Sequence, residues 1–553
     1  MRRLWLVLPL VLGLGSGCTT GTGRGGPDGG DGSRPPILEG CDEGADRDGD
    51  GIADAAEGNF DSDGDGLVNW DDPDSDGDGI LDSEEHAGNV PCSLPDADMD
   101  GTPNWLDADS DNDGLSDADE RDVYSTDPLN RDSDNDGVTD LGEALGTRTD
   151  PNDASSTIPE GDFFVVLPYN DPAQNRTLRF NTDLQLADVY FLIDTTGSMG
   201  SAIANVTSSL TRISDTIRMR IPNVQLGVGE YRDFPNSSGG PFSGGYGSEG
   251  DMPYGNRQNI TDNLASVQSA LSALSAAGGG DGPESASEAL FQTATGMGAN
   301  WTFSAGGAPF NLPRQNCPAV LDETGRRRGY PCFRPDSLPI VVLVTDAAFH
   351  NGDGGSNPYT GISPTPATFD AAVASLEGIG ARFVGVSVDS GPLGDLEEVA
   401  RQTGSLDAAG GLPLVYPAAG GAVSDAIIEG IETLAGRTPQ DVDTLVENVD
   451  GNPDAFDARL FIKAVTPLEG FNGAISGPMP GVTYASKDET TFFEVIPGTL
   501  VDFEVRFLND VRPPAQTAQI FRATIIVRGN RVARLDARQV YIVVPPDGAI
   551  ILI

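Results

Sequence analysis

Six copies of one acidic pattern run from Asp46 to Glu143, and they restrict what this part of the chain can fold into more than any other feature. Each copy has Asp at positions one, three and five, glycine at position six, Asp or Asn at position nine, and Glu or Asp at position twelve. Alternate carboxylates can surround one cation, glycine permits a sharp turn, and the twelfth residue can close the coordination sphere. A disordered acidic spacer would not keep the glycine in every copy. We therefore expect several bound Ca²⁺ ions.

The predicted calcium ligands follow directly from this numbering. They are Asp46, Asp48, Asp50, Asp54 and Glu57; Asp61, Asp63, Asp65, Asn69 and Asp72; Asp74, Asp76, Asp78, Asp82 and Glu85; Asp96, Asp98, Asp100, Asn104 and Asp107; Asp109, Asp111, Asp113, Asp117 and Glu120; and Asp132, Asp134, Asp136, Asp140 and Glu143.

The copies follow one another closely, and prolines between them exclude the long helices that flank an EF-hand loop. Tandem loops of this kind, with Thr-Asp-Pro at 126–128 and 149–151, resemble thrombospondin type 3 repeats, including bacterial ones. We expect residues 42–156 to form a stalk that is stiff when calcium is bound and loose without it, because the carboxylates then repel one another.

A second feature begins at Val189, where an uncharged run through Ile193 predicts a buried strand. Apolar residues at three- and four-residue steps from Met199 to Arg220 predict a helix. Asp194, Thr196 and Ser198 therefore lie at the carboxyl edge of a sheet, where α/β folds bind ligands. One carboxylate and two hydroxyls at that edge suit a hard cation such as Mg²⁺.

This Asp-x-Thr-x-Ser segment, with Asp281-Gly282-Pro283-Glu284 and the strand that ends at Asp346, resembles the metal-ion-dependent adhesion site of von Willebrand factor A domains, in the form found in integrin β-subunits. The resemblance implies that Thr196, Ser198 and Glu284 bind one Mg²⁺ directly. It implies that Asp194 and Asp346 hold the ion through water, which leaves one position for a carboxylate of a protein partner.

The same resemblance allows a second cation site made by Asp233, Asp281 and Glu284. It argues against an adjacent regulatory site, because Gly200-Ser201-Ala202 replaces the acidic residues that such a site needs. We expect His350 to pack at the end of its strand rather than to bind metal.

Alternating strands and helices predict that residues 184–440 form an α/β doubly wound, Rossmann-like domain with a mostly parallel sheet. Short strands at 458–465, 490–495, 501–507, 520–527 and 538–544 predict an immunoglobulin-like β-sandwich over 441–553. Strands at 163–167 and 177–180, in the segment 157–183, are expected to pair with that sandwich, so that the central domain is inserted between its strands. The chain is thus multidomain.

The first residues predict export. Arg2-Arg3, an apolar run and small residues before Cys18 predict a signal peptide over 1–17. Cys18 resembles the lipidated cysteine of a bacterial lipoprotein, which implies an outer-membrane lipid anchor followed by a flexible linker over 18–41. The alternative is a secreted protein without lipid. In an oxidising compartment we expect two disulfides, Cys41–Cys92 and Cys317–Cys332, because each pair lies within one segment.

These features favour a surface adhesion or scaffold lipoprotein, exported to the outer membrane or cell surface, whose partner is a protein that presents a carboxylate. A net charge of −52 argues against binding nucleic acid. We do not expect an enzyme, because no nucleophile–base pair accompanies Ser198. The alternatives are a structural calcium-dependent envelope protein without an active metal site and a metal-dependent hydrolase.

Overall fold

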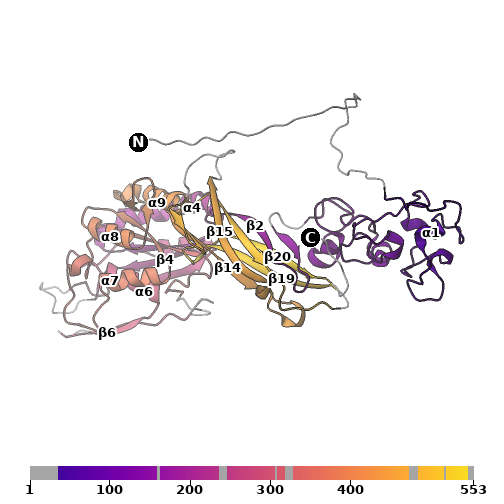
Figure 1. Ribbon diagram of the computed structural model, residues 1–553. Helices are drawn as coiled ribbons and strands as arrows, with labels where there is room; N and C mark the ends of the chain where they lie inside the picture. The colour runs from indigo at the N-terminus through magenta and orange to yellow at the C-terminus, as the bar shows by residue number, and fades with distance from the viewer. Residues whose placement is uncertain are drawn as a thin grey trace, which may run out of the picture. The chain divides into compact units, whose positions relative to one another are not determined.

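The computed structural model describes residues 35–157, 162–235, 246–304, 308–317, 328–472, 484–515 and 518–545 (Figure 1). The predicted signal peptide and Cys18 lie outside the described residues. The chain divides into two compact units, of which one contains the first four acidic copies and most of the fifth, and the other contains the sixth copy and everything after it. Among the described residues, no helix is long and apolar enough to cross a membrane.

The six acidic copies share one loop conformation, which ends in a single helical turn. The glycine at position six has a positive φ in every copy, between 90° and 105°. The backbone N–H of position seven donates to the carboxylate of position five in all six, over 2.7–2.8 Å. The turns that follow are α1 (Asp54–Glu57), η1 (Asn69–Asp71), α2 (Asp82–Glu85), η2 (Asn104–Leu106), α3 (Asp117–Asp119), η3 (Glu120–Tyr124) and η4 (Gly142–Thr147).

Few apolar side chains stabilise the first unit. Ile52 and Trp105 are fully buried, and the ring of His86 packs edge-on against Trp105 at 5.6 Å. The predicted disulfide between Cys41 and Cys92 is confirmed and closes the first three copies into one covalent loop. Because this core is so small, we expect the disulfide and the ions bound by the carboxylates to supply much of the stability of this unit.

The central domain contains a six-stranded sheet in the order β13-β10-β8-β3-β4-β5, in which only the edge strand β5 is antiparallel. Its strands are β3 (Leu186–Asp194), β4 (Asn223–Tyr231), β5 (Gly255–Thr261), β8 (Leu338–Thr345), β10 (Arg382–Ser387) and β13 (Val415–Pro417). The order places β3 and β8 side by side at the centre, so that their carboxyl ends meet at one edge. The doubly wound α/β fold is as predicted.

Helices cover both faces of this sheet (Figure 1). Along β3, Val189, Phe191 and Ile193 pack in one cluster with α4 (Gly200–Arg220), α5 (Leu264–Ser272) and α9 (Val423–Arg437). Tyr190 and Leu192 point to the opposite face and pack with α6 (Ala286–Thr295), α7 (Phe369–Gly378) and α8 (Leu393–Gln402). The uncharged run in β3 is therefore explained by burial on both faces.

An insertion between α6 and β8 carries β6 (Ala299–Phe303) and β7 (Phe310–Leu312), which pair with each other. β6 also pairs with β9 (Ile362–Ser363), which follows β8. The predicted Cys317–Cys332 disulfide is confirmed in the same insertion.

Two further sheets combine strands from both sides of the central domain. The larger has the order β1-β20-β19-β14-β17-β16 and the smaller β15-β18-β2. β1 (Phe163–Val166) pairs in parallel with β20 (Ala533–Val544), and β2 (Gln174–Asn181) pairs antiparallel with β18 (Thr499–Phe507). The remaining strands are β14 (Gln440–Asn448), β15 (Ile462–Asn472), β16 (Ser486–Lys487), β17 (Thr491–Val495) and β19 (Gln519–Gly529). Phe492 of the larger sheet meets Phe503 of the smaller one at 5.3 Å.

Two details differ from the sequence prediction. Ala458–Phe461 forms a 3-10 helix (η9) instead of the start of a strand, because the side chain of Asp457 accepts the N–H of Arg459 and turns the backbone. The internal strand β14 was not predicted. Its sequence, Gln440 to Asn448, contains three acids among apolar residues, and one of them, Asp443, is neutralised by Arg528 of the neighbouring strand.

The sixth acidic copy packs against the larger sheet within the second unit. Leu141 and Leu115 form a small apolar cluster with Val543 of β20. The N–H of Leu141 also donates to the carboxylate of Asp113 over 2.7 Å. A calcium loop and a β-sheet therefore share one core.

Candidate metal sites

The acidic loops bring together the carboxylates that the sequence assigned to calcium. One oxygen from each of Asp46, Asp48 and Asp50 lies within 4.8 Å of the others, and positions one, three and five of the second and third copies are grouped in the same way. Among the described residues, buried oxygens of Asp48, Asp76 and Asp78 have no hydrogen-bond partner. Clustered oxygen ligands without donors fit a hard divalent cation such as Ca²⁺.

Two glutamates at position twelve, Glu57 and Glu85, have the most strongly raised pKa values of the loops. Glu57 and Glu85 are each only 3% exposed, and none of their carboxylate oxygens has a hydrogen-bond partner within the described chain. Burial, followed by repulsion from nearby aspartates, raises the pKa of Glu57 to about 9 and that of Glu85 to about 10. A buried carboxylate in such surroundings is stable as an anion only beside a cation.

The ligand sets are not confined to single copies. Glu57 forms a group with Asp50 of its own loop and with Asp82 of the third copy. Asp82 also accepts the backbone N–H and the hydroxyl of Ser75, two residues into its own loop, over 2.7 and 2.6 Å. Position nine of the third copy therefore links that loop to the first copy as well as shaping its own loop. The sequence pattern shows which residues repeat, and it contains no signal for this contact between copies.

The central site is built at the carboxyl ends of β3 and β8. Asp194 is fully buried, and its Oδ1 accepts the N–H and the hydroxyl of Thr196 over 2.9 and 2.7 Å. Its Oδ2 accepts the hydroxyl of Thr345 over 2.7 Å. Burial raises the pKa of Asp194 to about 6, and these hydrogen bonds oppose the increase. Thr345 was not predicted as a site residue, although it directly precedes Asp346.

Glu284 reaches the same site from the segment before α6. Its backbone bridges to the end of β8, where its N–H donates to Ala348 and its carbonyl accepts from His350. A Cβ on Gly279 would lie 3.0 Å from Glu284 Oε1 and 3.5 Å from Thr196 Cβ, so the glutamate and the threonine approach the same glycine. Glu284 Oε2 is buried and has no hydrogen-bond partner among the described residues.

The remaining predicted residues of this site lie around it. Ser198 is exposed on the turn η5 (Gly197–Met199), and Asp346 is half-buried directly after β8. Burial raises the pKa of Glu284 far above its ordinary value, and repulsion from Asp233, then Asp194, adds to this effect. Carboxylate and hydroxyl oxygens with one unsatisfied buried oxygen fit a hard cation such as Mg²⁺.

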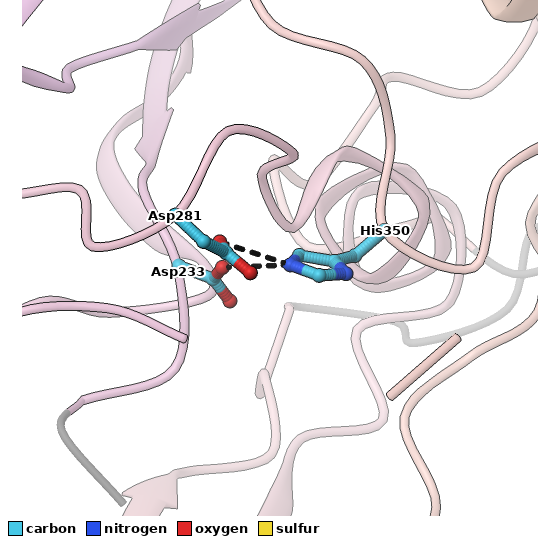
Figure 2. Close-up of side chains that lie close together, drawn as sticks. All are labelled: Asp233, Asp281 and His350. Atoms are coloured by element: carbon cyan, nitrogen blue, oxygen red, sulfur yellow. Dashed lines mark hydrogen bonds and ion pairs between the residues drawn. The ribbon is translucent and has the colours of Figure 1, made fainter. Parts of the chain in front are cut away.

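The residues predicted for a second site meet an unexpected neighbour. Figure 2 shows Asp233 and Asp281 facing the ring of His350. His350 Nε2 lies 3.4 Å from Asp233 Oδ2 and 3.2 Å from Asp281 Oδ1. His350 is 3% exposed and also stacks on Tyr359, with ring centroids 4.2 Å apart. It therefore packs at the end of the strand, as expected, and also contacts both acids.

Two residues that sequence reasoning missed support the loop around Glu284. Asp251 is 2% exposed and accepts the N–H groups of Ser248 and Gly279 over 2.6 and 2.9 Å. Arg232 donates to the carbonyl and the hydroxyl of Thr195 and pairs with Asp251 at 3.5 Å. Asp251 occurs in a Gly- and Ser-rich loop, where acids are ordinary turn residues, so its role depends on the tertiary fold.

Tandem acidic loops and a doubly wound domain with acids and hydroxyls at its sheet edge define a modular cation-binding protein. The family model of the bacterial TSP3 repeat matches residues 74–88 and 109–131, which supports the assignment of the acidic copies as repeats of this type. The comparison with curated proteins found no match.

Solved structures with similar parts include a von Willebrand factor type A protein from Catenulispora acidiphila, 12% identical, with 69% of this chain and 72% of that chain covered and a TM-score of 0.28. The pilus adhesin SpaC from Lactobacillus rhamnosus GG in its open conformation is 12% identical, over 68% and 45% of the two chains, with a TM-score of 0.27. Proximal thread matrix protein 1 from the mussel byssus is 13% identical, over 47% and 48%, with a TM-score of 0.26.

Proposed function

We propose that this chain is an exported surface lipoprotein in which a calcium-dependent stalk carries a von Willebrand factor A domain that binds a protein partner. In this proposal Cys18 carries the lipid in the outer membrane, and the sheets on either side of the central domain form an immunoglobulin-like sandwich. The match of bacterial TSP3 repeats supports the calcium-binding stalk. The observation that carries the binding role is the meeting of Asp194, Thr196 and Glu284 at one sheet edge.

The proposed ligand chemistry follows from the charges of this edge. Thr196, Ser198 and Glu284 would bind Mg²⁺, and Asp194 and Asp346 would support it, so the ion would carry positive charge at the surface. Ser198 is exposed, which leaves the edge open on that side. A carboxylate of a partner protein is the group that an exposed Mg²⁺ attracts. We propose binding rather than catalysis.

Calorimetric titration tests this proposal. The chain from Thr19 onward, saturated with Ca²⁺, is titrated with Mg²⁺ beside Asp194→Ala and a matched control, Asp215→Ala, which removes an exposed acid of α4. One magnesium event is expected in the wild type and in the control, and it should be absent in Asp194→Ala. An unchanged titration of Asp194→Ala would contradict the proposal.

The same variant separates the alternatives in cells. Loss of adhesion in Asp194→Ala, with export intact, supports the binding role. Loss of a hydrolytic turnover would indicate the metal-dependent hydrolase. A variant that adheres like the wild type, in an envelope that weakens only when calcium is removed, would indicate a structural protein.

A further inference from the structure

The tautomer of His350 is set by the loop that follows it. His350 Nδ1 lies 2.7 Å from the carbonyl oxygen of Asn357. Because a carbonyl only accepts hydrogen bonds, Nδ1 carries a proton and donates it. Nε2 then turns its lone pair toward Asp281 Oδ1 and Asp233 Oδ2 (Figure 2). Three electron-rich atoms face one another, so the site needs either a metal ion or a proton, carried by Nε2 or by one of the carboxylates.

The geometry of Asp233 favours a metal ion. Its Oδ1 accepts the N–H of Phe234 over 2.6 Å and the hydroxyl of Tyr359. Its Oδ2 is fully buried, points at His350 Nε2 and has no hydrogen-bond partner in the described part of the chain. A charge-assisted N–H···O bond would be about 2.7–2.9 Å long. The contact of Nε2 with Asp281 Oδ1, at 3.2 Å, is a long hydrogen bond, and Nε2 lies 3.4 Å from Asp233 Oδ2.

Those two separations match the spacing of ligands around a shared ion. Two ligand atoms that each lie about 2.1 Å from a metal are about 3.0 Å apart in an octahedral site and about 3.4 Å apart in a tetrahedral one. The Nε2–oxygen separations of 3.2 and 3.4 Å fall in this range. The two carboxylate oxygens lie within 4.8 Å of each other, so one ion can contact all three atoms.

The surroundings hold the imidazole and leave access from one side. Tyr246 packs edge-on against the His350 ring at 5.1 Å, and Tyr359 stacks on its face. The bond from Nδ1 to Asn357 is the kind of outer contact that orients metal-binding histidines. A cavity of about 680 Å³ borders Asp281 and His350, which gives an ion a route from solvent and room for a water ligand.

We infer that Asp233 Oδ2, Asp281 Oδ1 and His350 Nε2 bind one borderline divalent cation, of the class of Mn²⁺, Co²⁺ or Zn²⁺, beside the Asp194 site. One imidazole and two carboxylates suit these ions, whereas Ca²⁺ and Mg²⁺ prefer oxygen ligands alone. The assignment replaces the oxygen-only second site expected from the sequence, in which Glu284 was the third ligand, and it reverses the expectation that His350 does not bind metal. It does not depend on the proposed adhesion function.

Pulsed EPR of the Mn²⁺-loaded full chain tests the site, because coupling to ¹⁴N reports a bound imidazole directly. Excess Ca²⁺ keeps Mn²⁺ out of the acidic repeats. The chain has only two histidines, His86 and His350, so the nitrogen can be assigned by substitution. We expect ¹⁴N coupling in the wild type, its loss in His350→Gln, and its retention in His86→Gln and Asp194→Ala.

A second variant keeps the test decisive if His350→Gln fails to fold. Asp281→Asn preserves the imidazole and the shape of the loop but removes one charged ligand, so Mn²⁺ bound with ¹⁴N coupling should require at least about tenfold more metal. Thermal unfolding in Ca²⁺ verifies that each variant is folded. Absence of ¹⁴N coupling in the wild type, or its persistence in His350→Gln, would overturn the inference and leave a proton, on His350 or on one of the two acids, in place of the metal ion.

Discussion

Gly279 is the residue that brings the Glu284 loop against the end of β3. Its φ is +78°, a conformation that L side chains rarely adopt. Its N–H is held by Asp251 over 2.9 Å, and an added Cβ would press on Glu284 Oε1 at 3.0 Å. The absence of a side chain here therefore allows Thr196 and Glu284 to approach each other.

Replacing Gly279 by alanine should weaken the Asp194 site. We expect Gly279→Ala to reduce Mg²⁺ affinity about tenfold, because the added Cβ would press on Glu284 Oε1; this loss corresponds to about 1.4 kcal/mol. The positive φ should also destabilise the central domain by about 1–2 kcal/mol. Calorimetry and chemical unfolding measure the two effects. The control is Gly282→Ala in the same loop, where no described atom lies within 4 Å of an added Cβ. Equal Mg²⁺ affinity in both variants would contradict the prediction.

At the scale of elements, the acidic loop is one repeated conformation, and one copy of it packs against a sheet. Its glycine and carboxylate–backbone bonds repeat in all six copies. The sixth copy adds the buried Leu141, which packs with Leu115 and with Val543 of β20. An element built for metal binding therefore also supplies apolar contacts to a sheet.

Truncation of that contact should destabilise the second unit. We expect Leu141→Ala to lower its free energy of unfolding by about 2–4 kcal/mol, since Leu141 is fully buried and the lost side chain leaves a cavity. Denaturant unfolding in saturating Ca²⁺ measures the change. The matched control is Leu460→Ala, a leucine that is 48% exposed in the same unit and should change stability by less than about 0.5 kcal/mol. A similar loss in both variants would argue against the packing role.

At the scale of the whole molecule, the acidic repeats and the apolar central domain should depend on bound cations to different degrees. The chain carries a net charge of −52. In the first unit the buried glutamates Glu57 and Glu85 have strongly raised pKa values and few apolar neighbours, whereas the central sheet is buried on both faces by apolar helices. The two kinds of structure should therefore respond differently to calcium removal.

Chelation of calcium should unfold the repeats and leave the central domain folded. A site at ten times its Kd contributes about 1.4 kcal/mol, so the loss of several sites exceeds what a small core can replace. After chelation, scanning calorimetry should show that the unfolding transition of the repeats is lost and that of the central domain is retained. Trp105 is fully buried in the repeats, so its fluorescence should shift to longer wavelength, and Trp105→Phe should reduce this shift to the part contributed by the half-buried Trp70. A single transition that is insensitive to chelator would refute the expectation.

Much of the local structure could be predicted from residue patterns. The position-six glycines, the buried run of β3 and the helical steps of α4 follow from short-range chemistry. The two disulfides follow from the presence of one cysteine pair in each segment. β14 was missed because its three acids, Asp441, Asp443 and Glu447, resemble a surface loop until Arg528 of β19 neutralises Asp443. A pattern cannot show a partner that lies 85 residues away.

The sequence by itself determined which atoms can bind cations, because the spacing of carboxylates and glycines within a loop is local and the backbone turn follows from it. Only the tertiary structure decided which loops share ligands, as with Glu57 and Asp82, and which residues meet at the sheet edge. His350 illustrates the difference most clearly. Its place after β8 is evident in the chain, but its contacts with Asp233 and Asp281 exist only because the fold brings three separate segments together around one buried point.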